Sequence, residues 1–162
     1  MAEAFNERVL SAGKDDRYRE VAAEIASVLE GEPNLTARMA TVASMLSSSF
    51  DHYFWAGFYV VDGEELVVGP YQGTLGCLRI AFGRGVCGTA AATGKTQVVE
   101  DVHAFPGHIA CDSRSQSELV VPVFDKAGKL IAVLDVDSDR KAAFDDTDVR
   151  WLEAILADTF AR

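Results

Sequence analysis

The 162-residue sequence predicts an α+β fold: a mostly antiparallel sheet of about six strands, with helices packed on its faces. Long stretches with helical periodicity lie towards the two ends of the chain, at about 15–50 and 145–161. Segments rich in β-branched and aromatic residues fill the middle, about 51–140, and most are joined by turns or loops. Because no linker or repeat interrupts this order, we expect one domain over residues 1–162.

Three segments predict long helices. Residues 15–30 have acids in the first turn and Gly31 just past the end, and Asn34 is placed to cap a second helix. Asp145 is placed to cap the C-terminal helix. Each helix has one apolar face, formed by Tyr18, Val21, Ala22, Ile25, Val28 and Leu29 in the first, Leu35, Met39, Val42 and Leu46 in the second, and Val149, Leu152, Ile155, Leu156 and Phe160 in the last.

Six segments predict the strands. Residues 53–61 and 65–71 flank Asp62-Gly63, a typical turn pair, and therefore indicate a β-hairpin. The other four strand segments are 77–82, 96–100, 118–124 and 130–137, and a short helix is expected at 88–93. A tight connection at 126–129 joins the last two strands.

The charge balance excludes some classes of partner. The chain carries 25 acidic and 15 basic residues, a formal net charge of −10. Affinity for nucleic acid and for anionic membranes comes from Lys and Arg, so neither partner is expected. No run approaches the roughly 18 apolar residues of a membrane span, and the start lacks a basic region followed by an apolar stretch. These observations predict a cytoplasmic protein.

Three cysteines in a reducing compartment do not suggest a structural disulfide framework, so catalytic, redox or metal roles compete with simple packing. One of them, Cys111, lies in the segment 101–117, which has neither helical nor strand periodicity. The segment also contains two histidines, an arginine and two aspartates, and it is longer than most structureless loops. Long loops of this kind tend to carry function.

Four interpretations of the reactive residues are open. The run 83–88 fits G-x-G-x-x-G, but the repeated β-α-β units of a dinucleotide fold are missing. A zinc site from Cys77, Cys87, His103, His108 and Cys111 lacks the usual C-x₂₋₄-C spacing, and both histidines could simply bond the loop backbone.

The third interpretation is thiol redox catalysis. Cys111 lies close to Arg114, Cys87 begins the short helix and Cys77 begins a strand. A nearby arginine or a helix N-terminus stabilises a thiolate, and a second cysteine within reach completes a cycle from sulfenic acid to disulfide. In the fourth interpretation the chain is a small-molecule sensor domain whose cysteines only pack.

Residues 50–155 resemble the free methionine-(R)-sulfoxide reductase family, which has the GAF fold. The resemblance is carried by GRGVCGTAAATG at 83–94, DVHAFPGHIACD at 101–112 and LDVDS at 134–138. It implies an oxidoreductase, linked to oxidative stress, that reduces free L-methionine (R)-S-oxide to L-methionine. It also implies a homodimer, since members of the family often form one.

The resemblance also assigns roles to the cysteines. Cys111 would attack the sulfoxide sulfur and become a sulfenic acid, and Cys77 would resolve it as a disulfide that thioredoxin reduces. Cys87 would be a second resolving or relay thiol. The electrons would come from thioredoxin, and no cofactor or metal is expected.

The departing oxygen must be protonated, so the site needs a carboxylic acid with a raised pKa. Asp135 and Asp137 are two positions apart on one strand and therefore share a face, and Glu118 starts the preceding strand. We expect these three acids to bind and protonate the sulfoxide, as the family pattern also implies; an aspartate at a strand end can instead cap a turn.

Five further residues are expected to bind the substrate. Trp55 and Tyr59 share one face of a strand and the resemblance places both in the pocket, although two core aromatics would show the same spacing. Asp101 is expected to pair with the substrate ammonium. Backbone N–H groups around Asp112 and Ser113 are expected to hold its carboxylate.

Overall fold

The computed structural model describes residues 13–162. Residues 1–12, which contain the start of the chain discussed above, lie outside the described residues. The helices are α1 (Lys14–Val28), α2 (Leu35–Ser49), α3 (Gly85–Thr93), α4 (Asp146–Phe160) and a short 3₁₀ helix η2 (Val102–Ala104). The strands are β1 (Trp55–Asp62), β2 (Glu65–Gln72), β3 (Arg79–Ala81), β4 (Gln97–Val99), β5 (Ser117–Phe124) and β6 (Leu130–Ser138).

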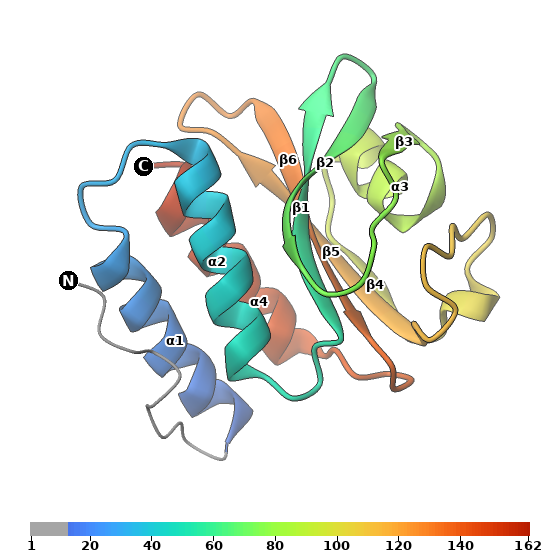
Figure 1. Cartoon of the computed structure of the whole chain (residues 1–162), viewed down its shortest axis with the longest axis horizontal. Coiled ribbons are helices and arrows are strands. Elements are labelled where there is room, and N and C mark those ends of the chain that lie inside the picture. The colour runs from blue at the N-terminus through green and yellow to red at the C-terminus, as the bar shows by residue number, and fades with distance from the viewer. Residues whose placement is uncertain (1–12) are drawn as a thin grey trace.

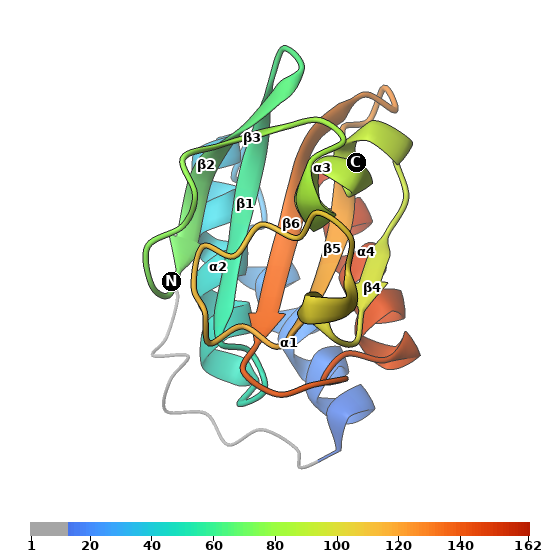
Figure 2. The ribbon, with the colours of Figure 1, turned by 90° about the vertical axis from the view of Figure 1, so that its right-hand side faces the viewer.

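The six strands form one antiparallel sheet in the order β3-β2-β1-β6-β5-β4 (Figure 1). Helices α1, α2 and α4 lie on one side of the sheet, and α3 lies on the other with the loop that follows β4 (Figures 1 and 2). The predicted α+β class is confirmed, and every expected strand is present in the sheet.

Two apolar cores lie on the two faces of the sheet, because successive side chains of a strand point to opposite sides. Phe58 and Leu134 pack with the three long helices, whereas Tyr59 and Val133 pack with α3. From Ala132 onward, the even-numbered apolar residues of β6 thus belong to the helical core. The odd-numbered residues from Val133 onward, including Asp135 and Asp137, face the other side, where the long loop lies.

The helix ends agree with the predicted caps. The Asn34 side chain accepts a hydrogen bond from the Ala37 N–H at 2.9 Å, and Asp145 forms a capping box with Asp148 at the start of α4. Helix α1 ends at Val28, two residues before the predicted end. None of the helices in residues 13–162 combines the length and the apolar character needed to cross a membrane.

Buried Asp148 connects the helical layer to the segment that enters β1. Its side chain is fully buried and accepts hydrogen bonds from Tyr18 at 2.6 Å, His52 at 2.9 Å and Lys14 at 2.8 Å. Burial alone would raise the pKa of Asp148, but these three donors outweigh it and hold the pKa well below its usual value. The anchored segment leads directly into Trp55.

The three short elements on the α3 side of the molecule, β3, β4 and α3, also differ from the sequence prediction in their bounds. The strand expected at 77–82 is shortened to β3, so Cys77 lies in the loop before the strand and not at its start. The strand at 96–100 is reduced to β4, and the helix expected at 88–93 begins at Gly85. Residues 101–116 form the expected loop, apart from η2, and Ser117 already belongs to β5.

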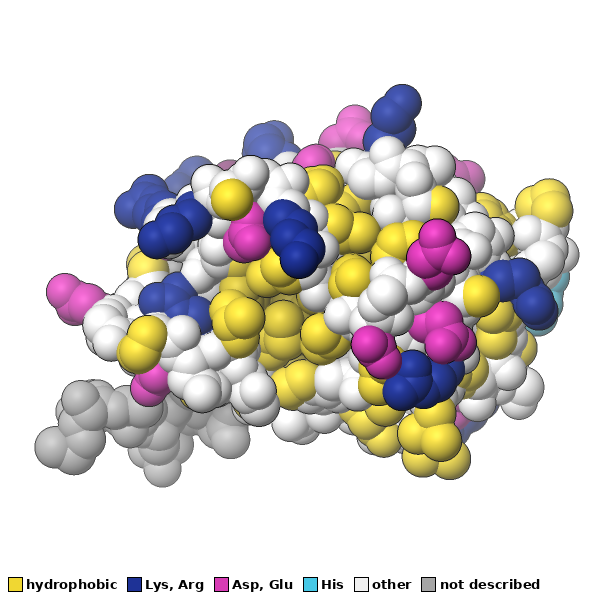
Figure 3. Space-filling view, turned by 90° about the horizontal axis from the view of Figure 1, so that it is seen from above, with side chains coloured by type: hydrophobic (Ala, Val, Ile, Leu, Met, Phe, Trp, Pro, Cys, Tyr) yellow, Lys and Arg dark blue, Asp and Glu magenta, His cyan; other side chains and the backbone are white. Residues whose placement is uncertain are grey.

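Acidic and basic side chains are mixed on the surface of the described residues (Figure 3). On the face drawn in Figure 3, Lys and Arg side chains lie among Asp and Glu side chains, with apolar side chains exposed between them. Several of the basic residues are in ion pairs, for example Arg79 with Asp62 at 3.1 Å and Arg114 with Asp112 at 2.8 Å.

Candidate active site

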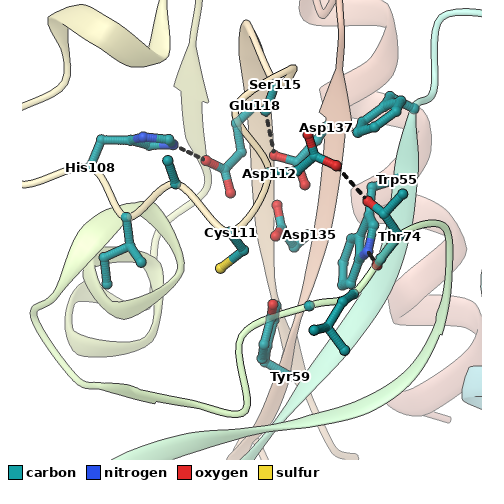
Figure 4. A pocket seen from close by; sticks show the side chains of 15 residues that line it. Trp55, Tyr59, Thr74, His108, Cys111, Asp112, Ser115, Glu118, Asp135 and Asp137 are labelled. Carbon is teal, nitrogen blue, oxygen red and sulfur yellow. Dashed lines mark hydrogen bonds and ion pairs between the residues drawn. The ribbon is translucent and has the colours of Figure 1, made fainter.

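A cavity lies on the face of the sheet opposite α1, α2 and α4. Its walls come from β1, β5, β6 and two loops, residues 73–78 and 101–116, that cross in front of the sheet (Figures 2 and 4). Seven of the predicted site residues line it: Trp55, Tyr59, Cys111, Asp112, Glu118, Asp135 and Asp137.

Strand register assembles the polar wall of the cavity. Asp137 on β6 pairs with Trp55 on β1 and with Glu118 on β5, so these three residues form one row across the sheet. Asp135 lies in the next row, beside Gly57. Figure 4 shows the three carboxyl groups on neighbouring strands and turned towards the same space.

The three acids share a buried environment that favours their protonated forms. Burial and the charge of Asp137 raise the pKa of Glu118 to about 8. The pKa values of Asp135 and Asp137 are also raised, in both cases first by burial and then by the charge of a neighbouring carboxylate. At neutral pH this cluster therefore holds protons that isolated carboxylates would have released.

Two of these acids have distinct partners. Ser115 donates a hydrogen bond to Asp137 Oδ1 at 3.3 Å. Asp135 is 5% exposed, and its Oδ1 atom has no hydrogen-bond partner among residues 13–162. A buried oxygen without a partner has a free energy cost that a bound polar group would relieve.

Cys77 and Cys111 form a disulfide between the two loops, with their Cα atoms 5.7 Å apart. Cys111 is exposed at the cavity, and Cys77 is half-buried. The two cysteines are the pair that the family resemblance implies, although the spacing in the sequence left the pairing open.

Cys87 is the third cysteine and remains a free, buried thiol in the first turn of α3. Its Sγ atom lies 3.9 Å from Glu118 Oε2, to which it donates a weak hydrogen bond. A helix N-terminus would favour the thiolate, but burial and the charges of Asp135 and Glu118 raise the pKa of Cys87 well above its usual value. The expectation of a stabilised thiolate is therefore wrong for Cys87.

The five residues that were considered as zinc ligands do not form a common set of thiolate and imidazole ligands in the structure. Cys77 and Cys111 are bonded to each other, and His103 is exposed on η2. A different trio, Cys87, Glu118 and Asp135, has donor atoms within 4.8 Å of one another. Burial raises the pKa values of all three groups and favours their protonated forms, so a cation would have to displace their protons.

The aromatic wall is formed by Trp55 and Tyr59, which are 5% and 2% exposed. Their rings stack with centroids 5.8 Å apart, and the Trp55 indole donates to the Thr74 carbonyl oxygen at 2.8 Å. Gly73 lets the loop approach this ring: its φ is +128°, and a Cβ atom there would lie 2.6 Å from Trp55. Both predicted aromatic residues thus contact the cavity, and Trp55 also fixes loop 73–78.

Asp112 connects the two loops in addition to the disulfide. It accepts hydrogen bonds from Thr74 at 2.8 Å and from Arg114 at 2.8 Å, and the Arg114 guanidinium lies 4.8 Å from the centre of the Phe54 ring. Arg114 and Thr74 hold the pKa of Asp112 well below its usual value. Asp112 is therefore an ionised carboxylate that is held in place by hydrogen bonds at the rim of the cavity.

Two predicted binding residues do not line the cavity. Asp101 caps η2 through the His103 N–H at 3.0 Å and pairs with Lys141 at 3.4 Å, so its carboxylate is engaged elsewhere. Ser113 is exposed, and Ser115 reaches the cavity in its place. The Arg114 N–H, one of the expected carboxylate donors, is bonded to Asp112.

Sequence reasoning missed several contacts in the cavity. His108 Nε2 lies 3.3 Å from Glu118 Oε1, and burial lowers the pKa of His108, so its neutral form is favoured. Phe54, Thr74 and Ser115 also line the cavity. His108 lies in the reactive loop and could have been paired with Glu118 on that ground, but no sequence signal marks Thr74 or Ser115.

Comparison with known proteins identifies the family. A GAF domain model matches residues 35–159. The chain is 41% identical over 144 residues to the free methionine-R-sulfoxide reductase of Escherichia coli (strain K12), covering 89% of this chain and 87% of the relative. It is 37% identical over 149 residues to the Saccharomyces cerevisiae protein of the same name, covering 88% and 83%.

A solved structure agrees with these relatives. The free methionine-R-sulfoxide reductase from Neisseria meningitidis, in complex with its substrate, superimposes with a TM-score of 0.89 at 49% identity, over 93% of this chain and 91% of that one. The chain therefore belongs to the free methionine-R-sulfoxide reductase family of GAF-domain proteins.

Proposed function

We propose that this chain reduces free L-methionine (R)-S-oxide to L-methionine, with Cys111 as the nucleophile. The observation that carries the proposal is the position of Cys111: it can form a disulfide, and it lies at a cavity whose wall is three buried carboxyl groups. Reduction of a sulfoxide requires a thiol as the reductant. It also requires an acid that protonates the departing sulfoxide oxygen.

The chemistry balances as two thiols oxidised for one sulfoxide reduced. The Cys111 thiolate attacks the sulfoxide sulfur and forms a sulfur–sulfur bond, while the sulfoxide oxygen is protonated. That bond then breaks as the oxygen passes to Cys111, so Cys111 becomes a sulfenic acid and methionine leaves. The Cys77 thiol then attacks Cys111 Sγ, the sulfenic oxygen departs as water, and the disulfide forms. The disulfide between the two loops corresponds to the oxidised state of the chain after these two reaction steps.

The carboxyl groups supply the proton and recognise the substrate. Glu118, with a pKa of about 8, is protonated at neutral pH and is the proposed proton donor. Asp135 and Asp137 are the proposed partners of the sulfoxide and of the substrate ammonium, in place of the distant Asp101. A methionine inside a protein chain has no α-ammonium because its nitrogen is in a peptide bond, so a carboxyl wall favours the free substrate over such a residue.

The remaining assignments follow from these roles. Trp55 and Tyr59 provide the apolar wall for the substrate methyl group. Cys87 is the proposed positioning residue of Glu118, because it is buried against that acid and is not in the disulfide. Thioredoxin is the proposed reductant, so no bound cofactor is required as a source of electrons. The homodimer and the cytoplasmic location stay predictions.

The function is tested by supplying the two sulfoxide epimers separately. We expect methionine to form from the (R) epimer with a thiol reductant present, and the (S) epimer to remain unconsumed, as measured by chiral chromatography. A sensor domain would bind a sulfoxide without consuming either epimer, and that result would contradict the proposal.

Changing Cys77 to Ser is expected to separate the first turnover from recycling. The variant should release about one methionine per chain, because Cys111 can still form its sulfenic acid, and then stall with thioredoxin as the only reductant. Rapid-quench measurement of methionine shows the burst and the plateau. Repeated thioredoxin-driven turnover at the wild-type rate would mean that another thiol, such as Cys87, resolves Cys111.

A further inference from the structure

Two leucines next to the redox-active disulfide are unusually exposed. Leu75 is 79% exposed and Leu78 is 73% exposed, whereas the next most exposed large apolar side chain in residues 13–162, that of Leu35, is 49% exposed. The two leucines lie two positions before and one position after Cys77. The most exposed apolar side chains of the described chain are therefore beside the bond that must be reduced after each turnover.

The loop that carries these leucines is held in place. The Leu78 carbonyl oxygen accepts a hydrogen bond from the Val68 N–H at 3.0 Å, and Gly76 is buried against Trp55. Cys77 is bonded to Cys111. Because the backbone is fixed on both sides, the leucines are presented to solvent in a defined place, which suits a contact surface.

The two ends of the disulfide differ in character. Around Cys111, the rim carries the ion pair between Asp112 and Arg114, and the Arg114 side chain is exposed. Around Cys77, the two leucines are exposed, and the exposed Arg79 that follows them is paired with Asp62 and Glu65. A partner with an apolar surface would have to remove water from the charges of the ion pair if it approached from the Cys111 side. If it approaches from the Cys77 side, it covers the apolar leucines, which is less costly.

We propose that Leu75 and Leu78 form the docking surface for a protein dithiol that reduces the Cys77–Cys111 disulfide. The inference rests on the proposed function only in requiring that the disulfide be reduced. The occupant is defined by the chemistry of the site: a protein with two thiols and an apolar surface around the attacking one. We refer to Leu75 and Leu78 together as the leucine pair.

The exchange balances within the two proteins. The partner thiolate attacks Cys77 Sγ, a bond forms between these sulfurs, the Cys77–Cys111 bond breaks, and its electron pair stays on Cys111 Sγ. The second thiol of the partner then attacks the partner's own sulfur in the mixed disulfide and releases Cys77. The partner ends as a disulfide, and this chain ends with two thiols after gaining two electrons and two protons.

The test measures reduction of the oxidised protein without any sulfoxide, so that its failure is distinct from failure of the proposed function. Oxidised wild type and Leu78→Asn are mixed with reduced thioredoxin or with dithiothreitol, and new thiols are counted after alkylation. Leu78 is chosen because Leu75 also lines the cavity. Loss of one buried leucine contact should lower the thioredoxin rate constant about tenfold and leave the dithiothreitol rate constant unchanged.

Two further variants complete the design. Leu35→Asn removes an exposed leucine on α2 and should change neither rate constant, whereas Leu78→Met keeps an apolar side chain and should retain most of the thioredoxin rate. Equal slowing of Leu78→Asn with both reductants, or no slowing with either, would overturn the proposal. So would a change of Leu78→Asn from a dimer to a monomer in sedimentation with unchanged thioredoxin kinetics, since the leucine pair would then bind a second copy.

Discussion

Cys111→Ser is expected to abolish production of methionine from the free (R)-sulfoxide. A serine hydroxyl is not ionised at neutral pH and cannot form a sulfenic acid, so neither the attack on sulfur nor the following resolution is possible. Removing a catalytic nucleophile lowers the rate by a factor on the order of 10⁶, which places this variant below detection. The measurement is methionine released in a single turnover, with no recycling reductant present.

Cys77→Ser is the matched control, because it makes the same substitution at the other end of the same disulfide. Both variants lack the cross-link between the two loops, so a difference between them reports on chemistry and not on the tether. Methionine should form in the burst of Cys77→Ser and be missing from Cys111→Ser. A burst of equal size in both variants would mean that Cys111 is not the nucleophile.

Local patterns predicted the elements of the fold well. Alternating and β-branched segments marked all six strands, and Asn34 and Asp145 marked helix starts because their side chains accept backbone N–H groups. The strand at 77–82 was too long in the prediction because Gly73 and Gly76 allow the chain to wrap around the Trp55 indole first. The contact between this loop and the Trp55 indole is a tertiary contact, so the local sequence does not predict it.

Strand periodicity made the acids of the site predictable, whereas Cys111 lies in a loop without periodicity and its role came from the family resemblance. The common face of Asp135 and Asp137 follows from their spacing, and Glu118 joins them because the register of β5 with β6 places it opposite Asp137. The pairing register of β5 with β6 could not be predicted from the sequence. In loop 101–117 there is no period, so Asp101 could not be distinguished from a cavity residue, although its side chain caps η2.

Glu118→Gln is expected to lower the single-turnover rate of methionine release by about 10²- to 10⁴-fold, the usual contribution of a general acid. Glutamine keeps the size and the hydrogen-bonding capacity of the side chain but cannot donate a proton as an acid. The pKa of Glu118 is raised to about 8, so the acid is protonated at pH 7 and loses its proton as the pH rises through 8. The wild-type rate should therefore fall above pH 8, and the low rate of the variant should not show this step.

The control for this change is Glu153→Gln, which makes the same substitution at an exposed position on α4, outside the cavity lining. It should leave both the rate and its pH dependence unchanged. If Glu118→Gln weakened substrate binding and left the single-turnover rate intact, Glu118 would be a binding residue. Burial and the neighbouring carboxylates also raise the pKa values of Asp135 and Asp137, so a pH-dependent step that persisted in Glu118→Gln would assign the proton to the aspartate pair.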